Sequence, residues 1–355
     1  MSTEGAGVGT TATTRQEPAA GGTPDLSGPP DGSALRAVAA GRFASWVRDG
    51  APHVPLPGGG RTWERFQALH GLGRDDLALA RLAEGHADAV AILAELGSPA
   101  PAPGERWGVW AAQPPGARLT ARPRADGRWL LDGVKPYCSG AHSCTHALVT
   151  ADTEEGRRLF ALSTDVPGYA PVPGTWQAIG MAGSDTPDVR FTGVEAVPVG
   201  GVDAYVRRPG FAHGGIGVAA CWLGGARGIA DTLFASASRR APDQLAAAHL
   251  GAVDVALHGA ECVLRVAATE IDADPQDRTG DAALRAMRAR AAVERVATLV
   301  LDHVGRALGA GPLCHDAVHA RRVADLTVYI RQHHADRDLA ALGTTLVAPP
   351  EGAGR

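Results

Sequence analysis

The feature that most constrains the fold is a strand-rich middle segment between two helical stretches. From Trp107 to about Ala204, short runs of β-forming residues are separated by Gly and Pro. The runs expected to form strands are Trp107–Ala112, His146–Thr150, Leu159–Ser163 and Val189–Thr192, together with three short runs within 118–141. Short strands over about 100 residues predict a small antiparallel β-barrel or sandwich.

Helical spacing precedes this segment. Helices are expected over Ala34–Val47, around Trp63–Leu72, and over Asp75–Leu96. In the last of these, apolar residues recur mostly at steps of three and four, which predicts one buried helical face. Gly97 and the Pro-rich residues after it should end that helix.

Helical spacing returns after Gly210. Four helices are expected, over Gly214–Arg239, Pro242–Ile271, Asp281–Leu308 and Ala317–Leu342. Four long helices with short connections predict a four-helix bundle. Within the first, Gly224, Gly225 and Ala226 favour a close approach of two helix backbones.

The expected fold class is therefore α+β. It comprises an N-terminal helical domain over 33–105, a middle β-domain over 106–204 and a C-terminal bundle over 205–343. Residues 1–32 are rich in Gly, Thr, Ala and Pro and hold few large aliphatic side chains, so we expect a disordered tail there. Residues 344–355 are expected to form a flexible tail.

The segment 118–141 contains two Asp-Gly pairs, at 126–127 and 132–133. Such pairs favour hairpin turns, so the chain should reverse at both places and form three strands. Alternation along the last strand would place Tyr137 and Ser139 on one face and Cys138 on the other. With Gly140 and Ala141 following, these side chains would form a shelf for a flat heterocycle; the alternative is an ordinary hairpin with a buried tyrosine.

This segment resembles the middle-domain signature of the acyl-CoA dehydrogenase superfamily. There, a hairpin ending in G-x-K is followed by an aromatic residue, one further residue, Thr or Ser, and a small or amide residue. The matching residues are Gly133-Val134-Lys135 and Tyr137-Cys138-Ser139-Gly140. The resemblance implies FAD as the cofactor, with Tyr137 against the flavin, Ser139 hydrogen-bonded near flavin N5, and Gly140 beside them.

A second stretch, Gly180–Ser184, resembles the G-x-R-G-S segment that closes the same domain in the family, with Ala182 where Arg is usual. The order of helices, β-domain and bundle also matches. The resemblance implies FAD bound between the β-domain and the bundle of a homodimer or homotetramer. Gly309–Pro312 resembles the family's G-G-x-G loop, which contacts the flavin of a neighbouring subunit.

Two family motifs are altered. Where the family has T-E-P-x-x-G-S-D, this chain has Ala112–Gly116 without the Ser-Asp part, and Gln113 is left as the residue that could offer an amide to the ring. Where the family has R-x-F-G after the first bundle helix, this chain has Arg239–Pro242. Arg240 is the candidate for contact with a neighbouring flavin, or a solvated arginine at a helix end.

The family's usual catalytic carboxylates are missing. Arg331 stands at the position of the Glu on the last helix, and no carboxylate lies in 214–216, near the second known base position. The candidates nearby are His213, His333 and His334, because a neutral imidazole can exchange protons near neutral pH. Superfamily members that hydroxylate substrates also lack the Glu and carry His on the last helix. The histidines could instead be structural, and Arg331 could anchor a substrate carboxylate or phosphate.

Composition excludes several other classes. The chain has 355 residues, of which 45% are hydrophobic and 20% charged, a net charge of −4 and a pI near 6.3. These values fit a soluble multidomain enzyme, with no basic cluster for nucleic acid, no apolar run for a membrane span and no secretory signal, so a cytoplasmic location is expected. Five scattered cysteines indicate neither a disulfide framework nor a metal site.

The sequence therefore predicts an FAD-dependent oxidoreductase acting on a small molecule such as an acyl thioester. The first reaction expected is oxidation of a CH–CH bond beside an activating carbonyl. The alternatives are a flavin monooxygenase that uses reduced flavin and oxygen, and a catalytically silent fold-mate of a related subunit. Either reaction could require an electron-transfer or reductase partner.

Overall fold

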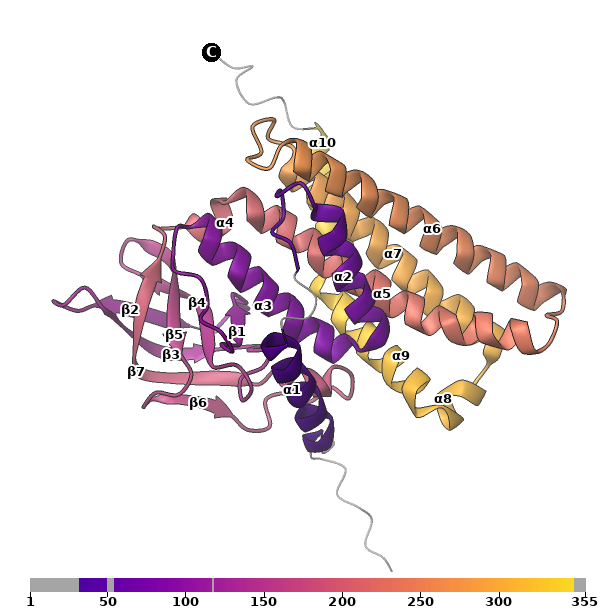
Figure 1. The fold of residues 1–355 in the computed structure, drawn as a ribbon, viewed down its shortest axis with the longest axis horizontal. Helices are drawn as coiled ribbons and strands as arrows, with labels where there is room; N and C mark the ends of the chain where they lie inside the picture. The colour runs from indigo at the N-terminus through magenta and orange to yellow at the C-terminus, as the bar shows by residue number, and fades with distance from the viewer. Residues whose placement is uncertain (1–31, 50–53, 117, 348–355) are drawn as a thin grey trace, which may run out of the picture.

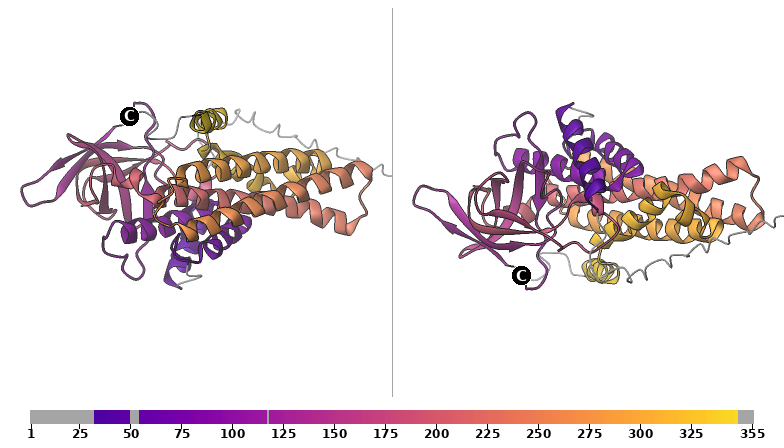
Figure 2. Two further views of the ribbon diagram at one scale, coloured as in Figure 1. Left: turned by 90° about the horizontal axis from the view of Figure 1, so that it is seen from above. Right: turned by 90° about the horizontal axis from the view of Figure 1, so that it is seen from below.

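The computed structural model describes residues 32–49, 54–116 and 118–347. A sheet domain occupies one end of the molecule and long helices extend from it to the other end (Figure 1). The elongated shape is plain in both perpendicular views (Figure 2). The tail expected over 1–32 falls outside the described residues except for its last residue.

Three helices pack across the junction between the sheet and the long helices (Figure 1). They are α1 (Ser33–Arg48), α2 (Thr62–Asp75) and α3 (Leu77–Glu95). Asp76 begins α3 as its N-cap, and its carboxylate accepts hydrogen bonds from the backbone N–H groups of Ala78 and Leu79. The three helices expected from periodicity are confirmed.

The sheet domain holds seven strands within the described residues. They are β1 (Trp107–Trp110), β2 (Leu119–Pro123), β3 (Trp129–Lys135), β4 (His146–Thr153), β5 (Gly156–Ser163), β6 (Tyr169–Val172) and β7 (Asp188–Val199). The pairings run β1-β4-β2-β3-β7-β5, and β5 pairs back with β4, which closes a barrel-like ring. The expectation of a purely antiparallel sheet is wrong, because β1 and β2 both pair with β4 in parallel.

The two Asp-Gly pairs behave differently. The chain reverses at Asp126-Gly127, through a connection closed by the Arg124 N–H to Arg128 carbonyl hydrogen bond of 2.8 Å. The reversal expected at Asp132-Gly133 is wrong: β3 runs straight through it and a register shift marks a bulge there. A Cβ on Gly133 would lie 2.2 Å from the Arg118 carbonyl oxygen, so the close approach of β2 requires glycine here.

The C-terminal part is helical. It contains α4 (Ala204–Arg207), α5 (Pro209–Arg239), α6 (Gln244–Ala273), α7 (Ala282–Leu308), α8 (Gly311–His315), α9 (Ala317–Tyr329), the 3-10 turn η2 (Ile330–Gln332) and α10 (Asp336–Val347). The first three long helices are confirmed. The fourth is not continuous as expected, because it breaks at His333, and its last piece runs on to Val347, into the expected C-terminal tail.

Contacts from α7 explain the break in the last helix. An Arg290 Nη2–H group donates to the Gln332 carbonyl oxygen (3.1 Å), and Arg331 Nη2 donates to Glu294 Oε1 (2.7 Å). These bonds take up a helix-end carbonyl and the Arg331 side chain, while Ala335 adopts a positive φ of 45°. The apolar periodicity of this segment could not predict the break, because periodicity does not record contacts made by another helix.

Small residues let α2 and α5 touch backbone to backbone. A Cβ on Gly224 would lie 2.0 Å from the His70 carbonyl oxygen, and one on Gly73 would lie 2.2 Å from the Cys221 carbonyl oxygen. The close packing expected at Gly224 is therefore confirmed. Among residues 32–49, 54–116 and 118–347, no helix combines the length and the apolar composition that crossing a lipid bilayer requires.

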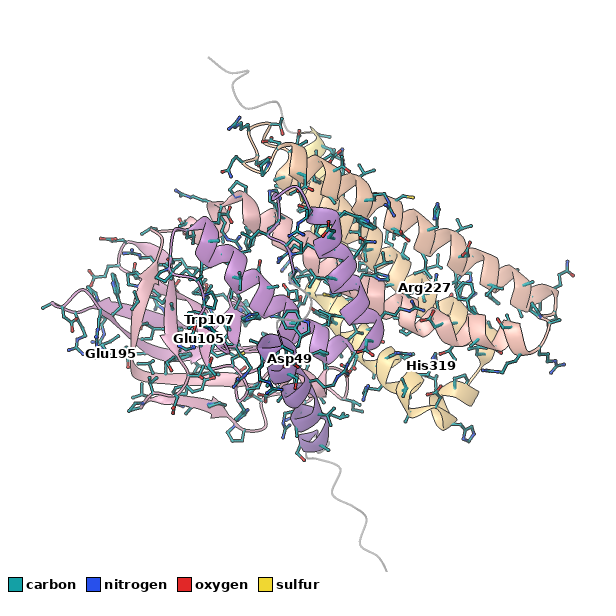
Figure 3. All side chains as sticks on the ribbon, viewed as in Figure 1. Asp49, Glu105, Trp107, Glu195, Arg227 and His319 are labelled. Carbon is teal, nitrogen blue, oxygen red and sulfur yellow. The ribbon has the colours of Figure 1, made fainter. Side chains whose placement is uncertain are left out.

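The stability of the junction between α3 and β1 is expected to depend on pH through His86, which lies on α3. Its Nδ1 accepts a hydrogen bond from the backbone N–H of Trp107 (3.2 Å), a residue seen on β1 beside α3 in Figure 3. Burial lowers the pKa of His86 to about 4. The unfolded state takes up a proton at His86 near pH 6.5, whereas the folded state resists protonation down to about pH 4.

We therefore expect His86 to cost the fold about 3 kcal/mol as pH falls from 6.5 to 4. In His86→Gln the amide oxygen can still accept from Trp107, so that loss should disappear. Urea unfolding of both proteins at pH 7 and pH 4.5 measures the difference. A stability difference between the two proteins that does not change with pH would contradict the assignment.

Candidate functional site

The candidate site lies where β3 ends, on two segments that we call the shelf: residues 137–141 and residues 180–187. The strand ends at Lys135, and Tyr137 then adopts a positive φ of 58°. Tyr137 is 51% exposed, whereas Ser139 is only 7% exposed and Cys138 is fully buried. The expectation that simple strand alternation places Tyr137 and Ser139 on one face is wrong, because the strand does not extend that far.

Backbone strain gathers on the shelf. Of the six non-glycine residues with positive φ among those described, three lie on it: Tyr137, Met181 (60°) and Asp185 (48°). Tyr and Met avoid the left-handed region, whereas Asp tolerates it, and such strain is retained where the surrounding structure imposes it, often at functional sites. The clustering of these backbone conformations favours the shelf as a ligand-binding site.

A chain of buried hydroxyl groups lies inside the shelf. Thr186 Oγ1 lies 3.1 Å from Ser139 Oγ and 2.7 Å from Ser184 Oγ, and Ser184 Oγ donates to the Met181 carbonyl oxygen at 2.8 Å. All three hydroxyl residues are buried. The Ser139 hydroxyl is therefore the end of a connected series, not an isolated group.

The shelf is anchored to α9. The backbone N–H of Met181 donates to Asp325 Oδ1, and a Cβ on Gly180 would lie 2.1 Å from the Ala324 carbonyl oxygen. Burial raises the pKa of Asp325 to about 6. The second sequence motif thus joins the sheet domain to the last bundle segment.

His142 fastens the two halves of the shelf together. Its backbone N–H donates to Asp185 Oδ2 (2.7 Å), and its Nδ1 lies 2.9 Å from Asp185 Oδ1. The hydrogen bond with Asp185 raises the pKa of His142. Because both carboxylate oxygens of Asp185 contact His142, this pair stands apart from the hydroxyl series.

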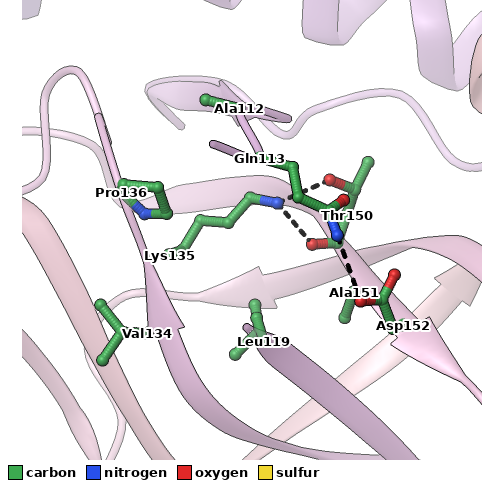
Figure 4. A pocket seen from close by; sticks show the side chains of 9 residues that line it. All are labelled: Ala112, Gln113, Leu119, Val134, Lys135, Pro136, Thr150, Ala151 and Asp152. Atoms are coloured by element: carbon green, nitrogen blue, oxygen red, sulfur yellow. Dashed lines mark hydrogen bonds between the residues drawn. The ribbon is translucent and has the colours of Figure 1, made fainter. Parts of the chain in front are cut away.

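Gln113 lies beside a small pocket next to the shelf (Figure 4). Its amide donates to Asp152 Oδ2 at 3.2 Å, so that donor is already engaged within the chain. The buried Lys135 ammonium donates to the carbonyl oxygen and Oγ1 of Thr150, and burial lowers the pKa of Lys135 to about 8. The pocket has room for roughly one water molecule.

His333 and His334, between η2 and α10, differ in burial and in the contacts of their ring nitrogens. His333 is buried, its Nδ1 accepts the backbone N–H of Ala335 (3.2 Å), and its Nε2 lies 3.8 Å from Asp338 Oδ2. His334 is exposed and its Nδ1 lies 3.3 Å from Asp338 Oδ1. Burial lowers the pKa of His333, so a neutral ring that accepts at Nδ1 and carries its proton on Nε2 is expected at neutral pH.

His213 is arranged differently. Its Nε2 lies 3.2 Å from the Pro275 carbonyl oxygen and therefore carries the proton, which leaves Nδ1 as the lone-pair nitrogen. That Nδ1 is buried and, among the described residues, has no hydrogen-bond partner. Burial also lowers the pKa of His213. Of the three histidines predicted, only His213 has a free buried nitrogen.

Arg290 brings together the two segments in which the sequence resemblance looked for a base, residues 214–216 and 331–334. It donates from Nη1 to the Gly215 carbonyl oxygen (2.9 Å) and from Nη2 to that of Gln332, and its guanidinium lies over the Trp222 ring. Arg331, the predicted substrate anchor, is already paired with Glu294. The sequence analysis missed Arg290 and Glu294. Both are charged residues among the apolar residues of α7, and that pattern could have identified them.

Arg240 lies away from all of these residues. It caps the C-terminal end of α5, at the α5–α6 connection, the end of the bundle farthest from the sheet (Figure 1). Within one chain the structure therefore does not bring Arg240 to the shelf. Among the described residues, no group of three or more His, Cys, Asp and Glu side chains could hold a metal ion.

No protein-family model and no curated protein matches the sequence. The structure, however, is similar to solved flavin enzymes over most of their length. The monooxygenase TdsC from Paenibacillus sp. A11-2, solved with FMN and indole, has a TM-score of 0.70 and 19% identity, covering 89% of this chain and 97% of its own. A glutaryl-CoA dehydrogenase from Mycobacterium smegmatis, in complex with FADH2, has a TM-score of 0.70 and 16% identity, with 90% and 95% covered.

The chain has the acyl-CoA dehydrogenase fold. A nitrososynthase from Micromonospora carbonacea var. africana also shares it, with a TM-score of 0.70, 19% identity, and 92% of this chain and 99% of its own covered. The resemblance to the acyl-CoA dehydrogenase superfamily that the sequence indicated is confirmed, and the low identities show that this chain is divergent. The structural similarity shows the acyl-CoA dehydrogenase fold. At identities this low it shows the fold alone, so the reaction has to be argued from the site.

Proposed function

We propose that the protein binds a flavin against the shelf and uses it to oxygenate a small molecule. The observation that carries the proposal is the strained, half-exposed Tyr137 beside the buried Ser139–Thr186–Ser184 hydroxyl series, at the junction of an acyl-CoA dehydrogenase fold. A flat aromatic contact and a hydroxyl group suit the isoalloxazine ring, which has apolar faces and hydrogen-bonding edges.

An unpaired donor beside the shelf also fits a flavin. Trp176 Nε1 is buried and lacks a hydrogen-bond partner among the described residues. Its neighbour Thr175 accepts the backbone N–H of Asp188, and Asp188 Oδ1 accepts that of Tyr137. Leaving a buried N–H unpaired costs about 1–3 kcal/mol. A ligand acceptor on the shelf would remove that cost.

Each residue then has a defined task. Tyr137 would contact the ring, Ser139 and Trp176 would hold its edge, and the free Nδ1 of His213 would exchange protons on the bundle side. When bound, the flavin supplies two-electron transfer and, in its reduced form, reaction with oxygen. FAD and FMN are both candidates, because solved enzymes of this fold are in complex with FMN in one case and FADH2 in another.

We rank oxygenation above dehydrogenation because of the Arg331–Glu294 ion pair. Removing an α-proton needs an available base near the substrate. Here the usual position holds Arg331, whose guanidinium is paired with the nearby Glu294 carboxylate. The Nδ1 lone pair of His333, which a base would use, already accepts the Ala335 N–H. Oxygenation needs no carboxylate base, but it needs reduced flavin, so a reductase or electron-transfer partner is part of the proposal.

Dehydrogenation of an acyl thioester is the second candidate, and Glu294 favours it. This carboxylate on α7 is held 2.7 Å from Arg331, so it could replace the missing glutamate from another helix. Anaerobic bleaching of the flavin-loaded protein by an acyl thioester, lost in Glu294→Gln but kept in Glu261→Gln, would favour this candidate. Product formed only with supplied reduced flavin and oxygen would favour oxygenation.

The Trp176→Phe variant tests the flavin site itself. It keeps a ring but removes the unpaired N–H, so we expect about 5- to 10-fold weaker flavin binding, with an unchanged or higher Tm without flavin. Flavin fluorescence titration with FAD and FMN measures the affinity. Trp46→Phe, which removes another buried unpaired indole N–H on α1, is the matched control.

If the unmodified protein binds neither flavin, oxidised or reduced, the proposal fails and the silent fold-mate alternative gains support. We also infer an assembly of at least two copies, since Arg240 and the 309–312 loop could contact only the flavin of another copy. Sedimentation with and without flavin tests this assembly. A protein that binds flavin as a monomer would contradict it.

A further inference from the structure

We propose that His249 on α6 and His303 on α7 form a binding site for a transition-metal ion such as Zn²⁺ or Cu²⁺, which clamps the two helices together. The site lies toward the end of the bundle that is farthest from the sheet domain (Figure 1). The inference goes beyond the proposed flavin chemistry and does not depend on it.

The two histidines face each other where the chain does not join their helices. His249 lies in the second turn of α6, soon after the α5–α6 connection, and His303 lies five residues before α7 ends at Leu308. Residues 274–281 connect the two helices at their other ends, nearer the sheet domain (Figure 1). The far ends lead instead to α5 and α8, so they are held to each other by side-chain contacts.

The ring nitrogens are separated by a distance that suits a shared ion. His249 Nδ1 lies 3.0 Å from His303 Nδ1, and the two ring planes are inclined at 79°. Zinc–nitrogen bonds are about 2.0–2.1 Å long, so two nitrogens bound to one ion at angles of about 90–110° lie roughly 2.9–3.4 Å apart. The observed separation falls within that range. Rotation of the two rings about χ2, which is a soft torsion in histidine, would direct both lone pairs at one ion.

Without an ion, the pair shares a single hydrogen bond. One Nδ1 carries a proton and donates it to the other Nδ1, so the two neutral rings adopt different tautomers. Metal binding requires both Nδ1 lone pairs, so the donor ring's proton moves through solvent to its own Nε2. The number of protons on the pair stays the same. Both side chains are half-buried, so solvent can take part in this exchange.

The ligand type selects the class of ion. Neutral imidazole suits Zn²⁺, Cu²⁺ and Ni²⁺, whereas Mg²⁺ and Ca²⁺ prefer oxygen ligands. Within the part of the chain that the structure describes, no third His, Cys, Asp or Glu joins the pair. Water therefore completes the coordination, and the site exchanges its ion with solvent instead of holding it permanently.

Zinc titration of the full chain, purified without a histidine tag, tests the proposal. At a Zn²⁺ concentration about a hundred times the Kd, the Tm should rise by roughly 5 °C. His249→Gln should abolish that rise, because glutamine keeps a polar side chain but lacks a nitrogen with a lone pair. His303→Gln should abolish it from the other helix, and Mg²⁺ should leave the Tm of the unmodified protein unchanged.

His258→Gln is the matched control. His258 is exposed on the same helix, and its Nε2 lies 3.7 Å from Cys262 Sγ, so these two side chains are the other metal-binding types in contact on α6. This variant should keep the full zinc response.

Two measurements on the unmodified protein give local readouts. Zinc should slow amide hydrogen exchange around His249 and His303 but not in the sheet domain. Bound Cu²⁺ should give an electron paramagnetic resonance spectrum with couplings from two imidazole nitrogens.

A zinc response that persists in His249→Gln and His303→Gln would overturn the inference, and so would a response that is lost in His258→Gln. An unmodified protein whose Tm and amide exchange do not change with zinc would also overturn it. Flavin binding is measured separately, so these outcomes leave the proposed function standing. Failure of the protein to bind flavin would likewise leave the zinc site standing.

Discussion

Gly224→Ala is expected to destabilise the protein by roughly 3 kcal/mol or more, a large effect for one added methyl group. The new Cβ would lie 2.0 Å from the His70 carbonyl oxygen and 2.8 Å from the Arg74 backbone nitrogen. Both atoms are helix backbone, so relief requires α2 and α5 to separate along a contact that joins the N-terminal helices to the bundle. Thermal and urea unfolding of the purified variant measure the loss.

Gly251→Ala is the matched control. Gly251 lies on α6, and a Cβ there would meet no atom within 4 Å. Since alanine favours helix over glycine by up to about 1 kcal/mol, this variant should be as stable as the unmodified protein or slightly more so. A Gly224→Ala protein with unmodified stability would show that the two helices are not in backbone contact.

Asp325→Asn is expected to stabilise the protein above pH 6, by about 1–3 kcal/mol. Burial raises the pKa of Asp325 to about 6 in the folded state, against 3.8 when unfolded. Between these values the folded state keeps a proton that the unfolded state has lost, so stability falls as pH rises from 4 to 6. The amide oxygen of asparagine can still accept the Met181 N–H, while the charge is gone.

The difference between the two proteins should shrink as pH falls towards the unfolded-state pKa of 3.8, below which the carboxyl is protonated in both states. Urea unfolding at pH 4.5 and pH 8 measures the difference between them. His86 acts in the opposite direction over almost the same pH range, so the unmodified protein alone would conceal both effects. A variant that is less stable at pH 8 would show that Asp325 contributes as an ionised acceptor.

Much of the fold follows from local pattern. The steps of three and four in α3, α6 and α7 predicted helices whose boundaries differ from the observed ones by only a few residues. Turn residues failed to separate the strands correctly at Asp132-Gly133, β6 (Tyr169–Val172) was not predicted, and β7 runs on past the predicted end at Thr192 to Val199. An Asp-Gly pair suits a hairpin turn and also a bulge, and pairing of β3 with both β2 and β7 selected the bulge.

The candidate site was harder to predict. The sequence pointed to Tyr137 and Ser139 but not to Thr186, Asp325 or Arg290, which lie 47 or more positions along the chain from Ser139. Periodicity also could not show that α9 ends just before Arg331 and Gln332, which Glu294 and Arg290 contact from α7. Such contacts depend on how helices and sheet are placed in space.

By itself, the amino-acid sequence determined the kind and order of the elements, because helix and strand periodicities and turn residues act over a few neighbouring positions. Only the tertiary structure decided the closure of the barrel-like sheet, the break before α10 and the hydroxyl series that ends on Ser139. These features arise from hydrogen bonds and backbone contacts between segments far apart in the chain, whose energies no local pattern records.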